Sequence, residues 1–494
     1  MAAISRRRFL GLTAAVGGGA LLAACGGGAP APTATPVPVA KPFATVAPTS
    51  APVAAGGAAG GSTASSAGAN AAEPLITAKP PQRPEPITLR FHFRAGGDKS
   101  EPAIYVERPG EWSQVTGHKI ALEPIPSGKE YPPKIVALAT AGNLGDLMFT
   151  SVSEANHFFF VQNKLIEPVD DYLPKYNIKK EEWVSAIIKT LTIGGKMYGM
   201  PKASNPAEAH FAINLKLFEE AGLKKPEIYG NSFDDLRNWA IKLTKGPPDR
   251  RDVYGIYSHT YANQAVTNGV RARGADLIDA AGEKSLVDSP QFNDWLQWNY
   301  KLYREDKVHP MPDVLKPGDS NALAGMFAAG KIAISQIHRS WMVAFKTAVG
   351  DKFPWMFVQH PKLPNAKGWV ANIDTHSATT QSKYKDEAFT LTYALADRRF
   401  AYVVAKGQGY LTGRVDNLEA IGPELAKDPF LQIQQKCTEE EEPWWIAKNL
   451  RQLEVEAELL NQLDTVWLGK RPPDKAFIGD LKKALDDVLA KPPL

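Results

Sequence analysis

The fold of this chain is decided by the segment Ile87-Thr88-Leu89-Arg90-Phe91-His92-Phe93-Arg94. From its first residue on, every second side chain is apolar, and this period of two predicts a strand. The segment runs into Ala95-Gly96-Gly97, which is a turn signal. A helical stretch through residues 112–116 stops at Gly117, and a second strand is predicted over residues 118–123. The first 40 residues of the folded body therefore have the order strand, helix, strand.

Strands and helices continue to alternate beyond this unit. Ser232 is a typical cap for the helix that comes after it, in which every third or fourth residue is apolar. Further strands are predicted at 147–150, 253–258, 331–337 and 369–373, and further helices at 134–141, 216–221, 291–305, 446–468 and 478–488. Because such alternation is typical of βαβ units, the sequence predicts an α/β protein with an open, mostly parallel sheet.

The N-terminal segment has the features of an export signal. Ser5-Arg6-Arg7-Arg8-Phe9-Leu10 matches the twin-arginine pattern, and the apolar residues 9–24 are too few and too rich in glycine for a good membrane-spanning helix. The segment ends in Leu22-Ala23-Ala24-Cys25, which resembles a bacterial lipobox; a chance Ala-Ala-Cys in an alanine-rich leader is the alternative. We expect residues 1–24 to be a lipoprotein signal peptide and Cys25 to become the acylated first residue of an extracytoplasmic, membrane-anchored protein.

Residues 25–85 are predicted to form a flexible tether that begins with the acylated cysteine. They consist mostly of Ala, Gly, Pro, Ser and Thr, with few charged or aromatic side chains, and so cannot bury enough apolar surface to become ordered. A random coil of about 60 residues spans roughly 40 Å. That length would let the folded body swing clear of the membrane surface.

Composition and motifs exclude several classes of protein. The 494 residues include 57 basic and 53 acidic side chains, and three of the arginines lie in the leader, so a nucleic-acid binder or a polybasic membrane surface is not expected. Cys437 has no partner if Cys25 is acylated, and it is predicted to be buried and inert. The nine histidines lack the spacing of a zinc helix, and there is no CxxC, P-loop or GxSxG motif, so no metal, cofactor or catalytic residue is predicted. Carboxylates far apart in sequence can still meet in space, as in glycosidases.

Five further stretches occur in a characteristic order. They are WSQVTGHKI at 112–120, ATAGNLGDL at 139–147, GGKMYGMP at 194–201, FAINLKLFEEAGL at 211–223 and GMFAAGKIAI at 325–334. Through them the chain resembles the extracellular solute-binding proteins of ABC importers, the broad sugar-binding family that includes maltose-binding proteins, over residues 87–494. It departs from the family pattern at Gly145, where a proline is usual, and at Ile213-Asn214-Leu215-Lys216, where Tyr-Asn-Lys is usual.

The resemblance implies a two-lobed, type II periplasmic-binding-protein-like α/β fold, with a hinge between the lobes and the ligand in the cleft. On that model, residues 86–207 and 336–378 form lobe 1, and residues 208–335 and 379–494 form lobe 2. Such lobes close over their ligand. The resemblance also implies a monomeric binding protein, not an enzyme, that delivers its solute to an ABC permease.

Ligand contacts are expected at strand ends and loops facing the cleft, because open α/β sheets bind ligands at the carboxyl ends of their strands. A sugar needs aromatic ring faces and planar polar groups around it. The candidates that fit are Arg94, Ser151, Glu154, Tyr257, Tyr261, His338, Arg339, Trp341, Asn372, Asp374, Trp444 and Trp445. Bland alternatives stay open: core packing for the aromatic residues, a helix start for Trp341 and Glu154, and a surface ion pair for Arg94. The acidic run 439–442 is predicted to be a solvated face.

We therefore expect a lipid-anchored protein that captures a carbohydrate, either an oligosaccharide or a related polyol, and delivers it to a permease. Peptides, polyamines and anions such as phosphate remain open as ligands. A secreted enzyme acting on polysaccharides and a ligand-sensing domain for a membrane receptor are the alternative functions. The sequence identifies neither the solute nor the aromatic residues that line the cleft.

Overall fold

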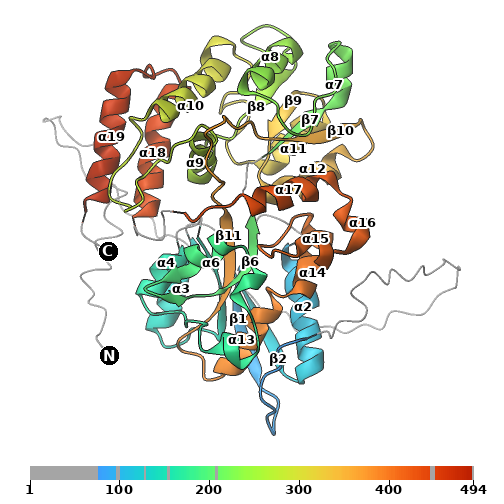
Figure 1. Cartoon of the computed structure of the whole chain (residues 1–494), viewed down its shortest axis with the longest axis vertical. Helices are drawn as coiled ribbons and strands as arrows, with labels where there is room; N and C mark the ends of the chain where they lie inside the picture. The colour runs from blue at the N-terminus through green and yellow to red at the C-terminus, as the bar shows by residue number, and fades with distance from the viewer. Residues whose placement is uncertain are drawn as a thin grey trace, which may run out of the picture. The chain divides into compact units, whose positions relative to one another are not determined.

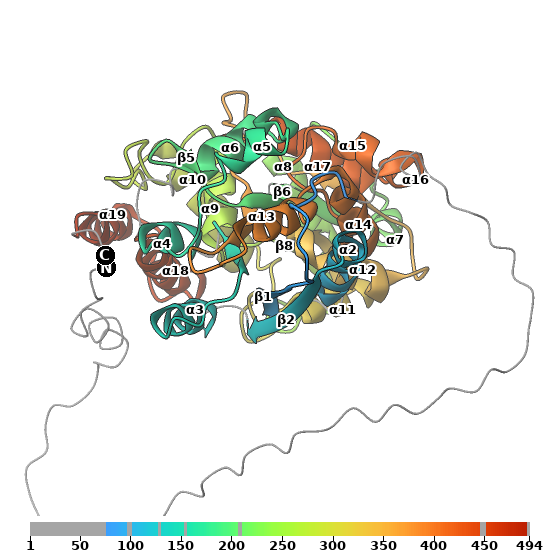
Figure 2. The same ribbon diagram turned by 90° about the horizontal axis from the view of Figure 1, so that it is seen from below.

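The computed structural model describes residues 76–95, 101–126, 130–152, 156–205, 210–444 and 451–491. The expected signal peptide, Cys25 and most of the expected tether lie outside these residues. Two main sheets, each covered by helices, make up the described body (Figures 1 and 2). Within the described residues, no helix combines the length and the apolar character that a membrane crossing needs.

The first sheet has the strand order β2-β1-β3-β11-β6. Its strands are β1 (Thr88–Ala95), β2 (Lys119–Pro126), β3 (Leu147–Ser151), β6 (Met200–Asn205) and β11 (Asn372–Ala378). Strand β1 pairs in parallel with β2 and β3, whereas β11 is antiparallel to both β3 and β6. The chain leaves the sheet at the carboxyl end of β6 and returns at Asn372, beside that same end. Strand β11 therefore runs opposite to β3 and β6.

The second sheet has the order β10-β7-β9-β8 and is also mixed. It consists of β7 (His210–Asn214), β8 (Tyr254–Tyr257), β9 (Ile332–Gln336) and β10 (Trp355–Gln359). Only β8 and β9 pair in parallel; β7 is antiparallel to β9 and β10 because it enters from the first sheet at the edge where those strands end. In each sheet a single strand, β11 or β7, runs opposite to all the others, so the predicted α/β class and the mostly parallel strand direction are both confirmed.

Helices alternate with the strands largely as predicted. At the start of α8, the Ser232 hydroxyl accepts a hydrogen bond from the Asp235 backbone N–H at 3.0 Å, and the Asp235 carboxylate accepts one from the Ser232 N–H at 2.9 Å, which confirms the predicted cap. The helix predicted over 291–305 ends in a π-helical turn, and the strand predicted at 369–373 begins only at Asn372. The helices near the first sheet are α2 (Glu101–Thr116), α3 (Tyr131–Thr140), α4 (Asn156–Gln162), α5 (Tyr172–Lys175), α6 (Ser185–Leu191), α13 (Lys385–Ala394) and α14 (Arg398–Gln408).

The remaining helices lie in the segments around the second sheet and in the C-terminal part of the chain. They are α7 (Leu215–Glu220), α8 (Phe233–Leu243), α9 (Asn263–Arg271), α10 (Pro290–Tyr300), α11 (Ser320–Ala328), α12 (Met342–Val349), α15 (Asn417–Ala420), α16 (Gly422–Ala426), α17 (Pro429–Glu439), α18 (Gln452–Trp467) and α19 (Lys475–Leu489). Cys437 on α17 is buried, as predicted, and burial raises the pKa of its thiol to about 12, so it is inert as a nucleophile.

Strand pairing and helix packing differ from the expected lobe division at two places. Strand β10 and helix α12, both expected in lobe 1, belong with the second sheet, because β10 pairs with β7 and α12 packs on α11. Helices α13 and α14, expected in lobe 2, pack on α2 of the first sheet, and α13 also packs on β11. A strand or helix pattern is local, whereas the sheet that it joins depends on contacts with residues far away in sequence. The other lobe boundaries stay a prediction.

The last ten residues of the expected tether also differ from the prediction. Ile76 and Ala78 are buried, and the guanidinium group of Arg83 is paired with the carboxylate of Glu387 on α13. Arg83 also lies 5.2 Å from the ring centre of Tyr384. Residues 76–87 thus form a strap on the first lobe. The fully buried Glu387 carboxylate is stabilised by a cation beside it, and Arg83 in the strap is that cation.

Candidate functional site

Four of the predicted residues meet where the two sheets face each other. Arg94 is the last residue but one of β1, Ser151 ends β3, and Asp374 lies beside Ser151 in the sheet register. Arg339, which comes after β9 of the second sheet, donates a hydrogen bond from Nη2 to Asp374 Oδ2 at 2.9 Å, and Arg94 Nη2 lies 3.9 Å from the same oxygen. An ion pair therefore joins the carboxyl end of a second-sheet strand to the first sheet.

Burial and charge act in opposite directions on Asp374. Burial alone would raise the pKa of this carboxyl, but Arg339, Arg94, Lys202 and a hydrogen bond from the Ser151 hydroxyl together lower it to about 2. Both members of the Arg339–Asp374 pair are 2% exposed. Asp374 is therefore an anion at neutral pH, fixed in position by its cationic neighbours.

Lys202, on β6, is a site residue that sequence analysis missed. It is fully buried, and its Nζ lies 5.2 Å from the ring centre of Tyr105 and 5.6 Å from that of Phe149. Arg94 lies 4.5 Å from the ring centre of Phe149. Cations over aromatic faces are attracted by the negative charge of the ring electrons. One feature of the sequence could have indicated it. Lys202 is the single charged residue of strand β6, which lies just before the place where the chain is expected to pass from the first lobe to the second.

Trp341 lies on the second-lobe side, between two histidines. Its ring centre is 4.9 Å from that of His259 and 5.9 Å from that of His338. His338 caps the 3₁₀ turn Arg339–Trp341 by accepting the Ser340 backbone N–H at 3.2 Å. Trp341 is half-buried and immediately precedes α12, as the helix-start interpretation predicts, and its role as a ligand contact stays a prediction.

The turn that carries Trp341 also reaches the first sheet. Asn372 Nδ2 and His338 Nε2 are 3.4 Å apart, which brings the first residue of β11 to the turn after β9. Two predicted residues, one in the turn after β9 and one at the start of β11, therefore meet beside Trp341.

Other candidates belong to the hydrophobic core. Tyr257 is 2% exposed and stacks on His309 with 5.2 Å between ring centres. Tyr261 packs against the core beside Tyr303, and burial raises the pKa of its hydroxyl to about 12. Trp444 is 3% exposed within the same core. The packing favours the core interpretation that sequence analysis left open for these aromatic residues, and their role as ligand contacts stays a prediction.

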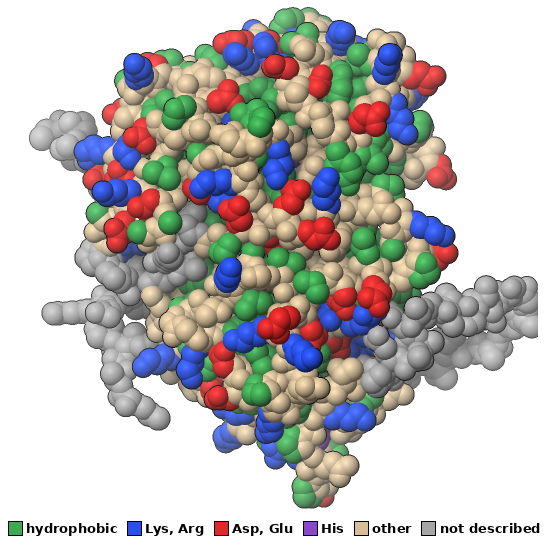
Figure 3. Space-filling model, viewed as in Figure 1, with side chains coloured by type: hydrophobic (Ala, Val, Ile, Leu, Met, Phe, Trp, Pro, Cys, Tyr) green, Lys and Arg blue, Asp and Glu red, His purple; other side chains and the backbone are tan. Residues whose placement is uncertain are grey.

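Two candidates, Glu154 and Trp445, lie outside the described residues. Within the described part of the chain, no group of three or more His, Cys, Asp or Glu side chains could hold a metal ion. Acidic and basic side chains are mixed over the face of the molecule in Figure 3.

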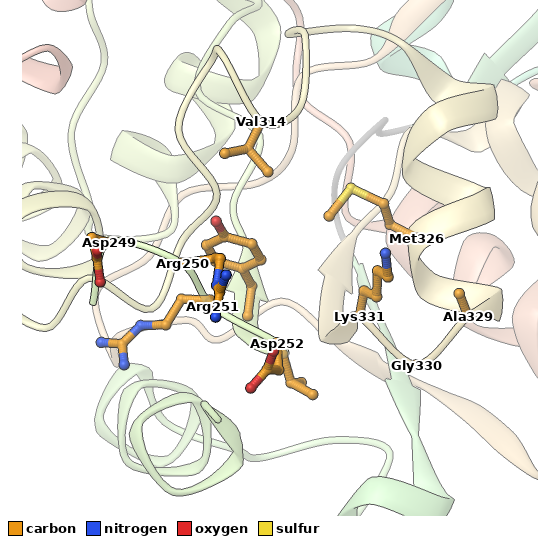
Figure 4. A pocket seen from close by; sticks show the side chains of 11 residues that line it. Asp249, Arg250, Arg251, Asp252, Val314, Met326, Ala329, Gly330 and Lys331 are labelled. Carbon is orange, nitrogen blue, oxygen red and sulfur yellow. The ribbon is translucent and has the colours of Figure 1, made fainter. Parts of the chain in front are cut away.

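A separate surface pocket of about 840 Å³ lies at the other end of the second sheet. It is bordered by Tyr254, where β8 begins, and by Lys331, just before β9. Figure 4 shows Val314 and Met326 at this pocket, and no residue predicted for the ligand site lines it. The pocket is thus separate from the site between the sheets.

The fold matches solved structures of two-lobed binding proteins. Similar ones include the ABC substrate-binding protein Lmo0181 from Listeria monocytogenes in complex with cycloalternan (16% identity, TM-score 0.68, covering 82% of this chain and 98% of that one). A solute-binding protein from Thermotoga lettingae bound with α-D-tagatose is 18% identical, with a TM-score of 0.67 and coverage of 82% and 100%. The sugar-binding protein MalE from Xanthomonas citri is 17% identical, with a TM-score of 0.68 and coverage of 82% and 97%.

Sequence comparison identifies the family. A search of curated protein sequences gave no match. The family model described as bacterial extracellular solute-binding protein matches residues 99–396, which is more than half of the chain. The two-lobed, type II periplasmic-binding-protein-like fold expected from the sequence is confirmed. The chain therefore belongs to the bacterial extracellular solute-binding proteins, which bind ligands for ABC transporters and are not enzymes.

Proposed function

We propose that this protein captures a carbohydrate between its lobes and delivers it to the permease of an ABC importer. The observation that carries the proposal is the Arg339–Asp374 pair beside the half-buried Trp341. Sugars present both hydroxyl groups and apolar C–H faces, and this site offers fixed polar groups and an aromatic face. The saccharides bound by the proteins from Listeria and Thermotoga support the same ligand class.

Lobe closure gives this arrangement a transport role. Arg339 and Trp341 come after a second-sheet strand, whereas Arg94, Ser151 and Asp374 lie on the first sheet. A ligand that contacts both groups gains its full binding energy only when the lobes are together, so it selects the closed state. The closed protein would then be the form that a permease receives.

The membrane anchor is part of the proposal. The twin-arginine pattern and the Leu22-Ala23-Ala24-Cys25 motif support export and acylation of Cys25. Acylation would hold the protein outside the cell membrane, with residues 26–75 as the linker and a monomer as the working form. The strap at residues 76–87 supports attachment of that linker to the first lobe.

A thermal-shift screen tests the ligand class. The folded body is heated with cycloalternan, tagatose, maltotriose, a peptide mixture, spermidine and phosphate in separate wells. A ligand at one hundred times its Kd adds about 2.7 kcal/mol to the free energy of unfolding, and so raises the melting temperature. We expect at least one saccharide to do so. A shift with only peptide, spermidine or phosphate would overturn the carbohydrate proposal.

A further inference from the structure

One residue of the acidic run Glu439-Glu440-Glu441-Glu442 departs from the solvated face that the sequence predicts: Glu439 and Glu442 are exposed and Glu440 is half-buried, but Glu441 is buried. The segment after α17 runs beside Trp369: the Trp369 N–H donates to Glu440 O at 3.1 Å, and the Glu442 N–H donates to Trp369 O at 2.8 Å. Successive side chains of an extended segment point to opposite sides. Glu440 and Glu442 pair with Lys362 and Arg271, while Glu441 points away from them and is 9% exposed.

Glu441 points toward the ligand site described above. Its Oε2 lies 3.4 Å from the hydroxyl of Ser204. Ser204 is on β6, two residues after Lys202. Burial raises the pKa of Glu441 well above the usual carboxyl range, against the lowering effects of Ser204, the Arg339 guanidinium group and Thr438, and so favours the protonated form of the carboxyl group. Glu441 therefore offers both an O–H donor and an acceptor oxygen beside Arg339.

Several polar atoms here make no hydrogen bond to any described residue. They are Oε1 of Glu441, Nε and Nη1 of Arg339, and Oδ1 of Asp374, all buried. Each buried polar group without a partner costs about 1–3 kcal/mol, so native proteins rarely retain several in one place without a reason. The three side chains come from the segment after α17, the turn after β9 and strand β11. Atoms of this kind are what a ligand rich in hydroxyl groups would satisfy.

We propose that Glu441 is a specificity-determining residue of this site, and that its carboxyl group and Arg339 together bind one hydroxyl group of the saccharide. This inference rests on the proposed function. A hydroxyl group can accept from Arg339 and exchange a hydrogen bond with the Glu441 carboxyl, which satisfies atoms on both residues. A site built to bind a hydroxyl group discriminates strongly against analogues that lack it, because its own buried groups then stay unpaired.

The test replaces Glu441 with side chains that separate binding from folding. Glu441→Met keeps the length but removes the polar group, and Glu441→Gln keeps neutral hydrogen-bonding atoms. Affinity for the saccharide with the largest thermal shift, and the melting temperature without ligand, are measured for each. Glu439→Met, on the exposed first residue of the same run, is the matched control.

We expect Glu441→Met to weaken binding by about tenfold or more while its ligand-free melting temperature stays equal or rises, because a buried unpaired group has been removed. Glu441→Gln should stay within about threefold of wild type, since its amide can still donate and accept. If Glu441→Met fails to fold, or melts lower and binds as well as wild type, Glu441 is structural and the proposal is overturned. Glu441→Ala, which cannot overfill the site, repeats the measurement.

The two proposals fail in distinguishable ways. If wild type binds no saccharide in the screen, the carbohydrate function falls, and the assignment of Glu441 falls with it. If wild type binds a saccharide and Glu441→Met binds it equally well, only the assignment of Glu441 is wrong.

Discussion

The Arg339–Asp374 pair gives the sharpest stability prediction. Asp374→Ala leaves the Arg339 guanidinium group buried without its hydrogen-bonded anion, and Arg94 then adds a like charge nearby. Breaking a buried ion pair from one side typically costs about 3–5 kcal/mol, whereas replacing both members by apolar residues is often neutral. We therefore expect Asp374→Ala to lose about 3–5 kcal/mol, and the double variant Arg339→Met/Asp374→Leu to recover most of that loss.

The same pair predicts a dependence on pH. The pKa of Asp374 is lowered to about 2 in the folded protein, below the value of about 3.9 for a free aspartate. A lowered carboxyl pKa stabilises the fold above the unfolded-state value, and this stability is lost as the pH falls through the folded-state value. The difference corresponds to about 2.6 kcal/mol, present at pH 7 and lost progressively between about pH 5 and about pH 1.

Urea unfolding at pH 7, 5 and 3 measures both effects. Because other carboxyl groups also titrate in this range, the quantity to compare is the difference between wild type and the double variant at each pH. As the pH falls, the free energy of unfolding of wild type should decrease relative to that of the double variant, which has no carboxyl group at position 374. Either of two results would refute this reasoning: a cost of less than about 1 kcal/mol for Asp374→Ala at pH 7, or a double variant as unstable as the single one.

The other predictions concern the aromatic site, the anchor and the strap. Trp341→Ala should weaken saccharide binding about thirtyfold with little change in ligand-free melting, whereas Trp444→Ala in the core should cost about 3–5 kcal/mol of stability; the reverse pattern, read by calorimetry and thermal melting, would exchange their roles. Cys25→Ala should leave a folded, ligand-competent protein that no longer pellets with membranes, and a variant that still pelleted would disprove the lipid anchor. Arg83→Met should lower stability by about 1–3 kcal/mol in urea unfolding because a buried carboxylate on α13 loses its partner, while the exposed Lys79→Met should not; equal effects would argue against the strap.

Local patterns were sufficient for the elements of the fold. The period-two alternation after Ile87 predicted β1, and the cap at Ser232 predicted the start of α8, because both depend on residues a few positions apart. The five ordered stretches were sufficient for the family and for the two-lobed fold. Choosing candidates at strand ends also brought Arg94, Ser151, Arg339 and Asp374 into the list before their contacts were known.

Tertiary structure alone decided which of these residues meet and which are buried. Glu441 looks like its three acidic neighbours in sequence, but pairing of its segment with Trp369 turns it inward. Lys202 is a site residue only because β6 lies beside β11. Strand β10 and the strap were misplaced for the same physical reason: the free energy that places them comes from contacts with residues more than a hundred positions away in sequence, and no local pattern carries that information.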